Sequence, residues 1–284
     1  MKKGMTWLAA MAFCVAIAAP AMAADPIKIG VAGAHSGDLA SYGVPSLNAA
    51  KVVIAEVNAN GGVLGRQIEL IAQDDQCKPE LATNAATKLI SEKVNVVMGH
   101  ICSGATKATL PLYTEAKIVS MSPSATTPSL TESGTNPYFF RTIANDKAQA
   151  KLTSDFILNG LKDDAFIKMA GKDAEGVYAS YPKDTSNLPA YKHAHEGHVK
   201  MFGSDPGSFY YNGYAATQAL VNAIAKAGST DAAKIVEALH TTPVETPLGK
   251  LTFSKTGDAA GMGLSIYQIK DGKFVELNHS ITLD

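Results

Sequence analysis

Short apolar runs alternate with helix-spaced apolar positions along residues 27–161. The runs have the length and composition of buried strands, whereas the segments between them repeat apolar residues every three or four positions. Strands are predicted at 27–32, 67–73, 94–98, 118–121 and 138–143. Helices are predicted from Pro45, Pro79 and about Ser103, and over 147–161. This alternation predicts an α/β fold, with a parallel sheet flanked by helices.

The pattern changes beyond residue 145. Helical spacing predicts helices over 188–202, 213–227 and 231–239, and residues 175–181 are strand-like. Further strands are expected only near the end, at 249–253, 264–269 and 274–277, with a hairpin at Asp271-Gly272. We therefore expect residues 24–145 to form a first α/β lobe, together with return segments from the C-terminal part. Residues 146–284 are expected to form an incomplete second lobe and the C-terminal strands.

The N-terminus has the pattern of a secretion signal. Lys2 and Lys3 precede an apolar stretch over 7–19, and Ala21-Met22-Ala23 has the small residues of a cleavage site. The apolar stretch is short for a membrane helix, and Pro20 lies at its end. A signal peptide is predicted over 1–23, with cleavage near Ala23 and export of the mature chain.

Composition excludes several classes of function. Hydrophobic residues make up 46% and charged residues 18% of the chain, which is typical of a folded globular protein. The 25 basic and 26 acidic side chains nearly balance, so no nucleic-acid partner is expected. The chain has neither a Gly-x-Gly-x-x-Gly motif nor a P-loop, and no cofactor is expected.

Two stretches rich in hydroxyl groups and small residues follow predicted strands. They are His100-Ile-Cys-Ser-Gly-Ala-Thr106 and Ser122-Pro-Ser-Ala-Thr126. Ligands of parallel sheets bind outside the carboxyl ends of the strands, where these stretches and the loop at 34–43 are expected to meet. The chemistry suits a small polar molecule held by hydrogen bonds. The alternative is that these are ordinary strand–helix connections.

Ser103 is expected to cap the helix that follows it. A helix N-terminus offers unpaired N–H groups and a partial positive charge, so a ligand carboxylate could bind there without Arg or Lys. The Thr126 hydroxyl and the backbone around Ser124 would lie at the neighbouring strand end. Tyr42, in the first loop, could cover the apolar part of a ligand.

Two cysteines remain after cleavage of the signal, Cys77 and Cys102. In an exported protein they most simply form one disulfide, which would stabilise the fold by about 3–4 kcal/mol in the chain-entropy model. A catalytic Cys102 assisted by His100 is the competing interpretation.

The chain resembles the substrate-binding proteins of branched-chain amino acid ABC transporters, which have the type I periplasmic-binding fold. The resemblance covers most of the first lobe, and Tyr214-Ala-Ala and Gly249-Lys-Leu-Thr-Phe253 extend it to the C-terminal part. The matching residues of the first lobe are Ile27-Lys-Ile-Gly-Val31, Tyr42-Gly43, Asn58-Ala-Asn-Gly-Gly62, Asp74-Asp75, Cys77 with Cys102, Gly99-His100-Ile-Cys-Ser103, Ser122-Pro-Ser-Ala-Thr126 and Arg141-Thr142.

The resemblance implies roles for the candidate residues. Ser103 and Thr126 would bind the α-carboxylate of a branched-chain or related amino acid, and the Ser124 carbonyl would accept a hydrogen bond from its ammonium. Ala125 is a further candidate ligand-binding residue, and Tyr42 would form a wall of the pocket. The Cys77–Cys102 disulfide would fix the loop that presents Ser103. The implied partner is an ABC permease in the inner membrane, and a monomer is expected.

One departure from the family suggests an internal deletion in the second lobe. Residues 161–171 lead almost directly into Asp173-Ala-Glu-Gly-Val177, a motif that lies far downstream in relatives. The deletion would remove the acidic partner of the ligand ammonium, so a remnant with weak or no ligand binding is the alternative. An exported hydrolase using Ser103 and His100 is a further alternative.

The histidines of the predicted helix 188–202 suggest a metal site as another alternative. His193, His195 and His198 lie close together in the sequence, but they lack the spacing of an HExxH motif. No metal is expected.

Overall fold

The computed structural model describes residues 25–156 and 175–283. The predicted signal peptide, the polar segment 162–172 and the end of the predicted helix 147–161 lie outside these residues. No helix among the described residues is both long and apolar enough to cross a membrane.

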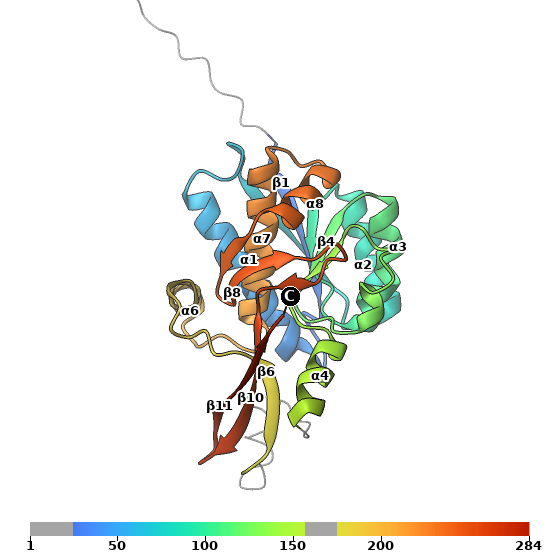
Figure 1. Cartoon of the computed structure of the whole chain (residues 1–284). Coiled ribbons are helices and arrows are strands. Elements are labelled where there is room, and N and C mark those ends of the chain that lie inside the picture. Colours follow the sequence, from blue (N-terminus) through green and yellow to red (C-terminus); the bar gives the residue numbers. More distant parts are fainter. Residues whose placement is uncertain (1–24, 157–174, 284) are drawn as a thin grey trace, which may run out of the picture.

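A five-stranded parallel sheet forms the centre of the larger part of the molecule (Figure 1). Its strand order is β2-β1-β3-β4-β5, and every neighbouring pair is parallel. The strands are β1 (Ile27–Gly33), β2 (Ile68–Asp74), β3 (Val96–Met98), β4 (Val119–Ser122) and β5 (Phe139–Arg141). The predicted α/β fold with a parallel sheet is therefore confirmed.

Helices cover both faces of this sheet (Figure 1). Val96 and Met98 pack into a core shared with helices α1, α7 and α8, whereas Val97 packs into a second core with α2 and α3. Alternate residues of a strand point to opposite faces, so the apolar run of β3 supplies both cores. The helices are α1 (Ala40–Ala59), α2 (Pro79–Ser91), α3 (Ser103–Glu115), α7 (Tyr210–Ala227) and α8 (Ala232–Thr241).

A smaller antiparallel sheet extends from the parallel sheet (Figure 1). Its order is β11-β10-β6, and helix α4 packs against β10 and β6. Asp271 and Gly272 both have positive φ and turn the chain between β10 and β11, which confirms the predicted hairpin. The elements are α4 (Asp146–Phe156), β6 (Tyr178–Pro182), β10 (Gly263–Lys270) and β11 (Lys273–Thr282).

The remaining elements connect the two sheets. Helix α6 (Pro189–Phe202) packs against α1 and α7. Strands β7 (Val244–Thr246), β8 (Gly249–Phe253) and β9 (Ala259–Ala260) form a small antiparallel sheet, of which only β8 was predicted. Helices α7 and α8 thus return from the C-terminal part of the chain to the parallel sheet. The division at residue 145 into two lobes stays a prediction.

Helix α1 begins earlier than its sequence predicts. Gly43 and Pro45 suggested a start at Pro45, but the helix begins at Ala40. Tertiary packing explains the difference, because an added Cβ on Gly43 would lie 1.9 Å from the Ala34 carbonyl oxygen. Glycine allows the first turn of α1 to lie directly on the backbone that leaves β1. Tyr42 therefore lies in a helix and not in the predicted loop.

This close approach predicts opposite effects for two alanine substitutions. Gly43→Ala should lower the free energy of unfolding by about 1–3 kcal/mol, because the new methyl group meets backbone that has to move. Gly104→Ala is the matched control, since its nearest neighbour would be Pro79 Cγ at 3.8 Å. Alanine favours a helix over glycine, so this variant should be unchanged or more stable by up to about 1 kcal/mol. Urea unfolding followed by circular dichroism measures both. Equal losses would contradict the packing argument.

Candidate functional site

The three segments predicted to carry the site meet at the carboxyl ends of the strands of the parallel sheet. Strand β3 lies between β1 and β4, so the segments after these strands are neighbours. The strand order also reverses between β1 and β3, which is where ligands of open parallel sheets bind. The sheet thus brings the segments at 34–43, 100–106 and 122–127 together.

Hydrogen bonds interlock the two hydroxyl-rich stretches. Ser122 Oγ donates to the His100 carbonyl oxygen at 2.6 Å, and Ser124 Oγ donates to the Ile101 carbonyl oxygen at 2.6 Å. The Thr127 N–H donates to Ser103 Oγ at 3.3 Å. The segments after β3 and β4 therefore form one unit, in which Ser122 and Ser124 act as structural links.

Ser103 is the first residue of α3, and Cys102 is the N-cap, without a side-chain capping bond. The prediction that Ser103 caps the helix is therefore wrong. Its hydroxyl accepts from Thr127 instead, which leaves the N–H groups of the first turn to be satisfied from outside the helix. The positive end of α3 lies directly beside the segment that carries Thr126.

The Cys77–Cys102 disulfide is present, with 5.4 Å between the two Cα atoms. It joins the segment after β2 to the N-cap of α3. Asp75 Oδ1 accepts from the Cys77 N–H at 2.7 Å and helps to fix this connection. A bonded cysteine has no thiolate, so Cys102 cannot be the nucleophile of the competing interpretation.

His100 lies in a buried network below the loops. Its Nδ1 is 2.5 Å from Asp75 Oδ2, its Nε2 is 3.0 Å from the Tyr113 hydroxyl, and both Asp75 and His100 are fully buried. Burial, together with the charge of Asp75, raises the pKa of Tyr113, whose hydroxyl therefore stays protonated. Both ring nitrogens of His100 thus face Asp75 and Tyr113, and not Ser103 as the hydrolase alternative required.

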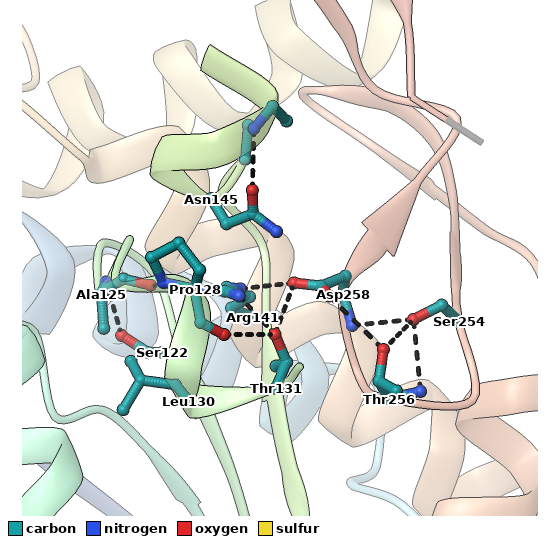
Figure 2. A network of polar contacts seen from close by, with 12 residues as sticks. Ser122, Ala125, Pro128, Leu130, Thr131, Arg141, Asn145, Ser254, Thr256 and Asp258 are labelled. Carbon is teal, nitrogen blue, oxygen red and sulfur yellow. Dashed lines mark hydrogen bonds and ion pairs between the residues drawn. The ribbon is translucent and has the colours of Figure 1, made fainter. Parts of the chain in front are cut away.

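The Arg141 side chain binds backbone carbonyl oxygens of the segment after β4 (Figure 2). Its side chain is fully buried, and its Nη1 donates to the carbonyl oxygens of Ala125 at 3.1 Å and Thr127 at 2.9 Å. Its Nη2 donates to Thr131 Oγ1, and its Nε donates to Asp258 Oδ1 at 2.6 Å. The sequence pattern marked Arg141 only as part of a family motif, and it gave no indication of this network.

The remaining candidates on this segment differ in exposure. Ala125 is buried, and its N–H donates to Ser122 Oγ at 2.9 Å. Thr126 is partly exposed, and its carbonyl oxygen accepts from the Asp146 N–H at the start of α4. Thr126 therefore lies partly exposed where the segment after β4 contacts the start of α4.

Tyr42 faces an aromatic residue from the C-terminal part. The rings of Tyr42 and Phe209 have centroids 5.8 Å apart. Nearby, Thr142 and Asn212 exchange two hydrogen bonds, from Thr142 Oγ1 at 2.9 Å and from Asn212 Nδ2 at 2.7 Å, each to the other's carbonyl oxygen. Phe209 and Asn212 also line a cavity of about 350 Å³ between β6, α6 and α7. The first turn of α7 therefore borders the sheet edge that carries the predicted site.

The histidines of α6 contact other groups individually. His193 Nε2 is 3.2 Å from Glu56 Oε1, and His195 Nδ1 is 3.0 Å from the Tyr211 hydroxyl. His198 is buried against the rings of Phe202 and Tyr210. Within residues 25–156 and 175–283, no three His, Cys, Asp or Glu side chains are grouped so that they could hold a metal ion.

Comparison with known proteins identifies the family. The family described as periplasmic binding protein matches residues 26–167 and 155–273. The chain belongs to this family. Its members and the similar proteins named below are solute-binding proteins, not enzymes. The two matched ranges overlap at 155–167, close to residues 161–177, where an internal deletion is expected.

Similar proteins include two amino-acid-binding proteins. The leucine-, isoleucine-, valine-, threonine- and alanine-binding protein of Pseudomonas aeruginosa is 28% identical, with 94% of this chain and 97% of that protein covered. The Leu/Ile/Val-binding protein of Escherichia coli K12 is 25% identical, with 91% and 95% covered. A crystal structure of a leucine-binding protein from Thermotoga maritima has a TM-score of 0.76 at 18% identity, covering 91% and 99%. This likeness confirms the type I periplasmic-binding fold.

This periplasmic binding protein is shorter than its relatives. The alignment with the Pseudomonas protein extends over 364 positions, although the chain has only 284 residues. Because nearly the full length of both proteins is covered, the difference consists of internal gaps. A second lobe shorter than that of the relatives agrees with the predicted fold class.

The Arg141 network predicts a large effect for the loss of one carboxylate. Asp258→Asn would leave the buried guanidinium without a counter-charge, and removing one partner of a fully buried pair costs about 3–5 kcal/mol. Asp258 is 27% exposed, so we expect a loss of about 2–3 kcal/mol in the free energy of unfolding.

The exposed Lys147–Glu132 pair supplies the control. Glu132→Gln should change the free energy of unfolding by less than about 0.5 kcal/mol. Chemical denaturation measures both variants, and hydrogen exchange at the Ala125 amide should rise only in Asp258→Asn. Comparable losses in the two variants would show that the Arg141 pair is not the stabilising contact.

His35, in the segment after β1, predicts a pH dependence of stability. Burial lowers the pKa of His35, and the charges of Asp74 and Asp75 offset only part of this effect. The unfolded chain therefore takes up the proton at a higher pH than the folded chain. Stability should be complete above the ordinary pKa of 6.5 and decline as the pH falls below it. Between pH 7 and pH 5, His35→Gln should reduce the slope of unfolding free energy against pH. An unchanged slope would refute the assignment.

Proposed function

We propose that this protein is the solute-binding component of an ABC importer and binds a branched-chain or related amino acid in the periplasm. Membership of the periplasmic binding protein family carries this proposal. The names of the Pseudomonas and Escherichia relatives support the ligand class. The partner would be an inner-membrane permease, and a monomer with a signal peptide cleaved near Ala23 fits this role. We propose no catalytic activity.

The interlocked loops suit recognition of a carboxylate. The first turn of α3 supplies N–H groups and a partial positive charge, and Ser103 and Thr126 add hydroxyl groups beside it. A charge-assisted hydrogen bond contributes roughly 1.5–3 kcal/mol, so a few such bonds hold an α-carboxylate without Arg or Lys.

The other proposed contacts have different roles. The Ser124 carbonyl oxygen would accept from the ligand ammonium, and Tyr42 would cover the apolar side chain of the ligand. Ala125 uses both backbone polar groups within the protein, with Ser122 and Arg141, and its methyl group is buried in an apolar cluster with Leu110, Leu130 and Phe139. Its contribution to ligand binding would therefore be to fix the shape of the loop between Ser124 and Thr126.

The shortened second lobe is the reason for the alternative function, a remnant with weak or no ligand binding. We infer that an internal deletion near residues 155–175 removed an acidic group that would pair with the ammonium. An unpaired ammonium in a closed cleft is costly, so a remnant with weak or no binding is the outcome to be tested against.

Thermal stability with added amino acids tests the proposal directly. A ligand at 100 times its Kd raises stability by about 2.7 kcal/mol, because it binds only the folded chain. Leucine, isoleucine or valine at millimolar concentration should therefore raise the melting temperature of the mature protein. Ser103→Ala should weaken binding by about 10- to 100-fold, the equivalent of one charge-assisted hydrogen bond.

Ser129→Ala is the matched control, because Ser129 is an exposed serine in the segment after β4, which also carries Thr126, and it lies outside the proposed contacts. It should bind as the unaltered protein does, as measured by calorimetry. If none of the three amino acids raises the melting temperature, the alternative of a remnant with weak or no ligand binding would be favoured. Equal affinity of Ser103→Ala and Ser129→Ala would show that the ligand binds elsewhere.

A further inference from the structure

The backbone carbonyl of His100 joins two parts of the proposed carboxylate site. Its oxygen accepts from Ser122 Oγ at 2.6 Å and from Thr106 Oγ1 at 3.0 Å. Ser122 is the last residue of β4, and Thr106 lies in the first turn of α3. Ser122 Oγ in turn accepts from the Ala125 N–H at 2.9 Å. One carbonyl oxygen therefore sets the position of the first turn of α3 against the loop that carries Thr126.

The ring of His100 is held through both of its nitrogens. Nδ1 lies 2.5 Å from Asp75 Oδ2, and Nε2 lies 3.0 Å from the Tyr113 hydroxyl. A carboxylate only accepts hydrogen bonds, so Nδ1 carries a proton and donates it to the bond with Asp75. All three side chains are buried, and a rotation of the ring would leave polar groups unpaired away from water, which is unfavourable. The ring, and with it the backbone of His100, is therefore held in one orientation.

Asp75 is itself fixed at the ends of two neighbouring strands. It directly follows β2, and its N–H donates to the carbonyl oxygen of Gly33, the last residue of β1, at 3.0 Å. Its Oδ1 accepts from the Cys77 N–H at 2.7 Å. The Cys77–Cys102 disulfide joins the same two segments two residues further along each of them. The disulfide holds the two segments together, whereas the contact with Asp75 orients the His100 peptide that precedes it.

We propose that His100 is a positioning residue of the carboxylate site. Its ring, fixed by Asp75 and Tyr113, directs the carbonyl oxygen that aligns the first turn of α3 with the segment after β4. The inference rests on the carboxylate recognition of the proposed function and names the buried group that keeps this site in shape. His100 acts through Ser122 and Thr106, and its ring stays below the site. Hydrogen bonds weaken steeply when their angles change, so a small shift between the two segments should weaken carboxylate binding.

Calorimetry with leucine and leucinamide separates positioning from a general loss of stability. Leucinamide keeps the amino group and the side chain of leucine but has no carboxylate, so the unaltered mature protein should bind it at least tenfold more weakly. His100→Gln places an amide nitrogen near the position of Nε2, loses the bond to Asp75 and should reduce this preference to about threefold or less. His100→Asn places its amide nitrogen near the position of Nδ1, so it should rescue the preference to within about twofold of the unaltered protein.

Tyr113→Phe and Tyr210→Phe form a matched pair that tests the same contact if the His100 variants do not fold. Both tyrosines are buried; the Tyr113 hydroxyl bonds to His100, and the Tyr210 hydroxyl donates to the Ala194 carbonyl oxygen in α6 at 2.9 Å. Tyr113→Phe should lower the preference for leucine about threefold. Tyr210→Phe removes a hydroxyl outside the proposed contacts and should leave the preference unchanged, even where its stability falls as much.

The outcomes separate this inference from the proposed function. An unchanged preference for leucine in folded His100→Gln, or in Tyr113→Phe, would overturn the inference and leave the proposed function intact. Equal falls in Tyr113→Phe and Tyr210→Phe would also overturn it, because the preference would then follow stability and not position. If the unaltered protein binds none of leucine, isoleucine and valine, the proposed function fails and the inference fails with it.

Discussion

The rest of the site depends on the hydrogen bonds and the ion pair of the buried Arg141 guanidinium. A charge inside a protein is tolerated only when its donors find acceptors and its charge finds a partner. Arg141 meets both conditions through the segment after β4 and through Asp258, which lies 117 residues further along the chain. The loop that carries Thr126 therefore has its shape only when β5 and the turn before β9 are both in place.

The parallel sheet and its binding edge could be predicted because they follow from local pattern and general topology. Apolar runs mark β1, β3 and β4, and the rule for parallel sheets gives the edge at which their loops meet. The cysteine count and the predicted export were enough to pair Cys77 with Cys102. These inferences need only the order of elements along the chain.

The polar contacts of the site could not be predicted in the same way. Nothing near Arg141 in the sequence points to Asp258, and nothing near His100 shows that its ring is buried beneath the site and not directed into it. The start of α1 was missed because Gly43 looks like a helix breaker, although it is required for contact with the backbone at Ala34. In each case the deciding neighbour is distant in sequence.

The return of α7 and α8 to the parallel sheet has a consequence for the timing of folding. One face of β3 and β4 is covered by residues beyond 210, so a nascent chain that has reached only α4 leaves this face exposed to water. Contacts of such large sequence separation form slowly, since loop closure precedes the gain from packing. The N-terminal half therefore cannot complete its core until α7 and α8 have been synthesised. Such a delay keeps the chain unfolded for longer, which is compatible with the export that its N-terminal sequence predicts.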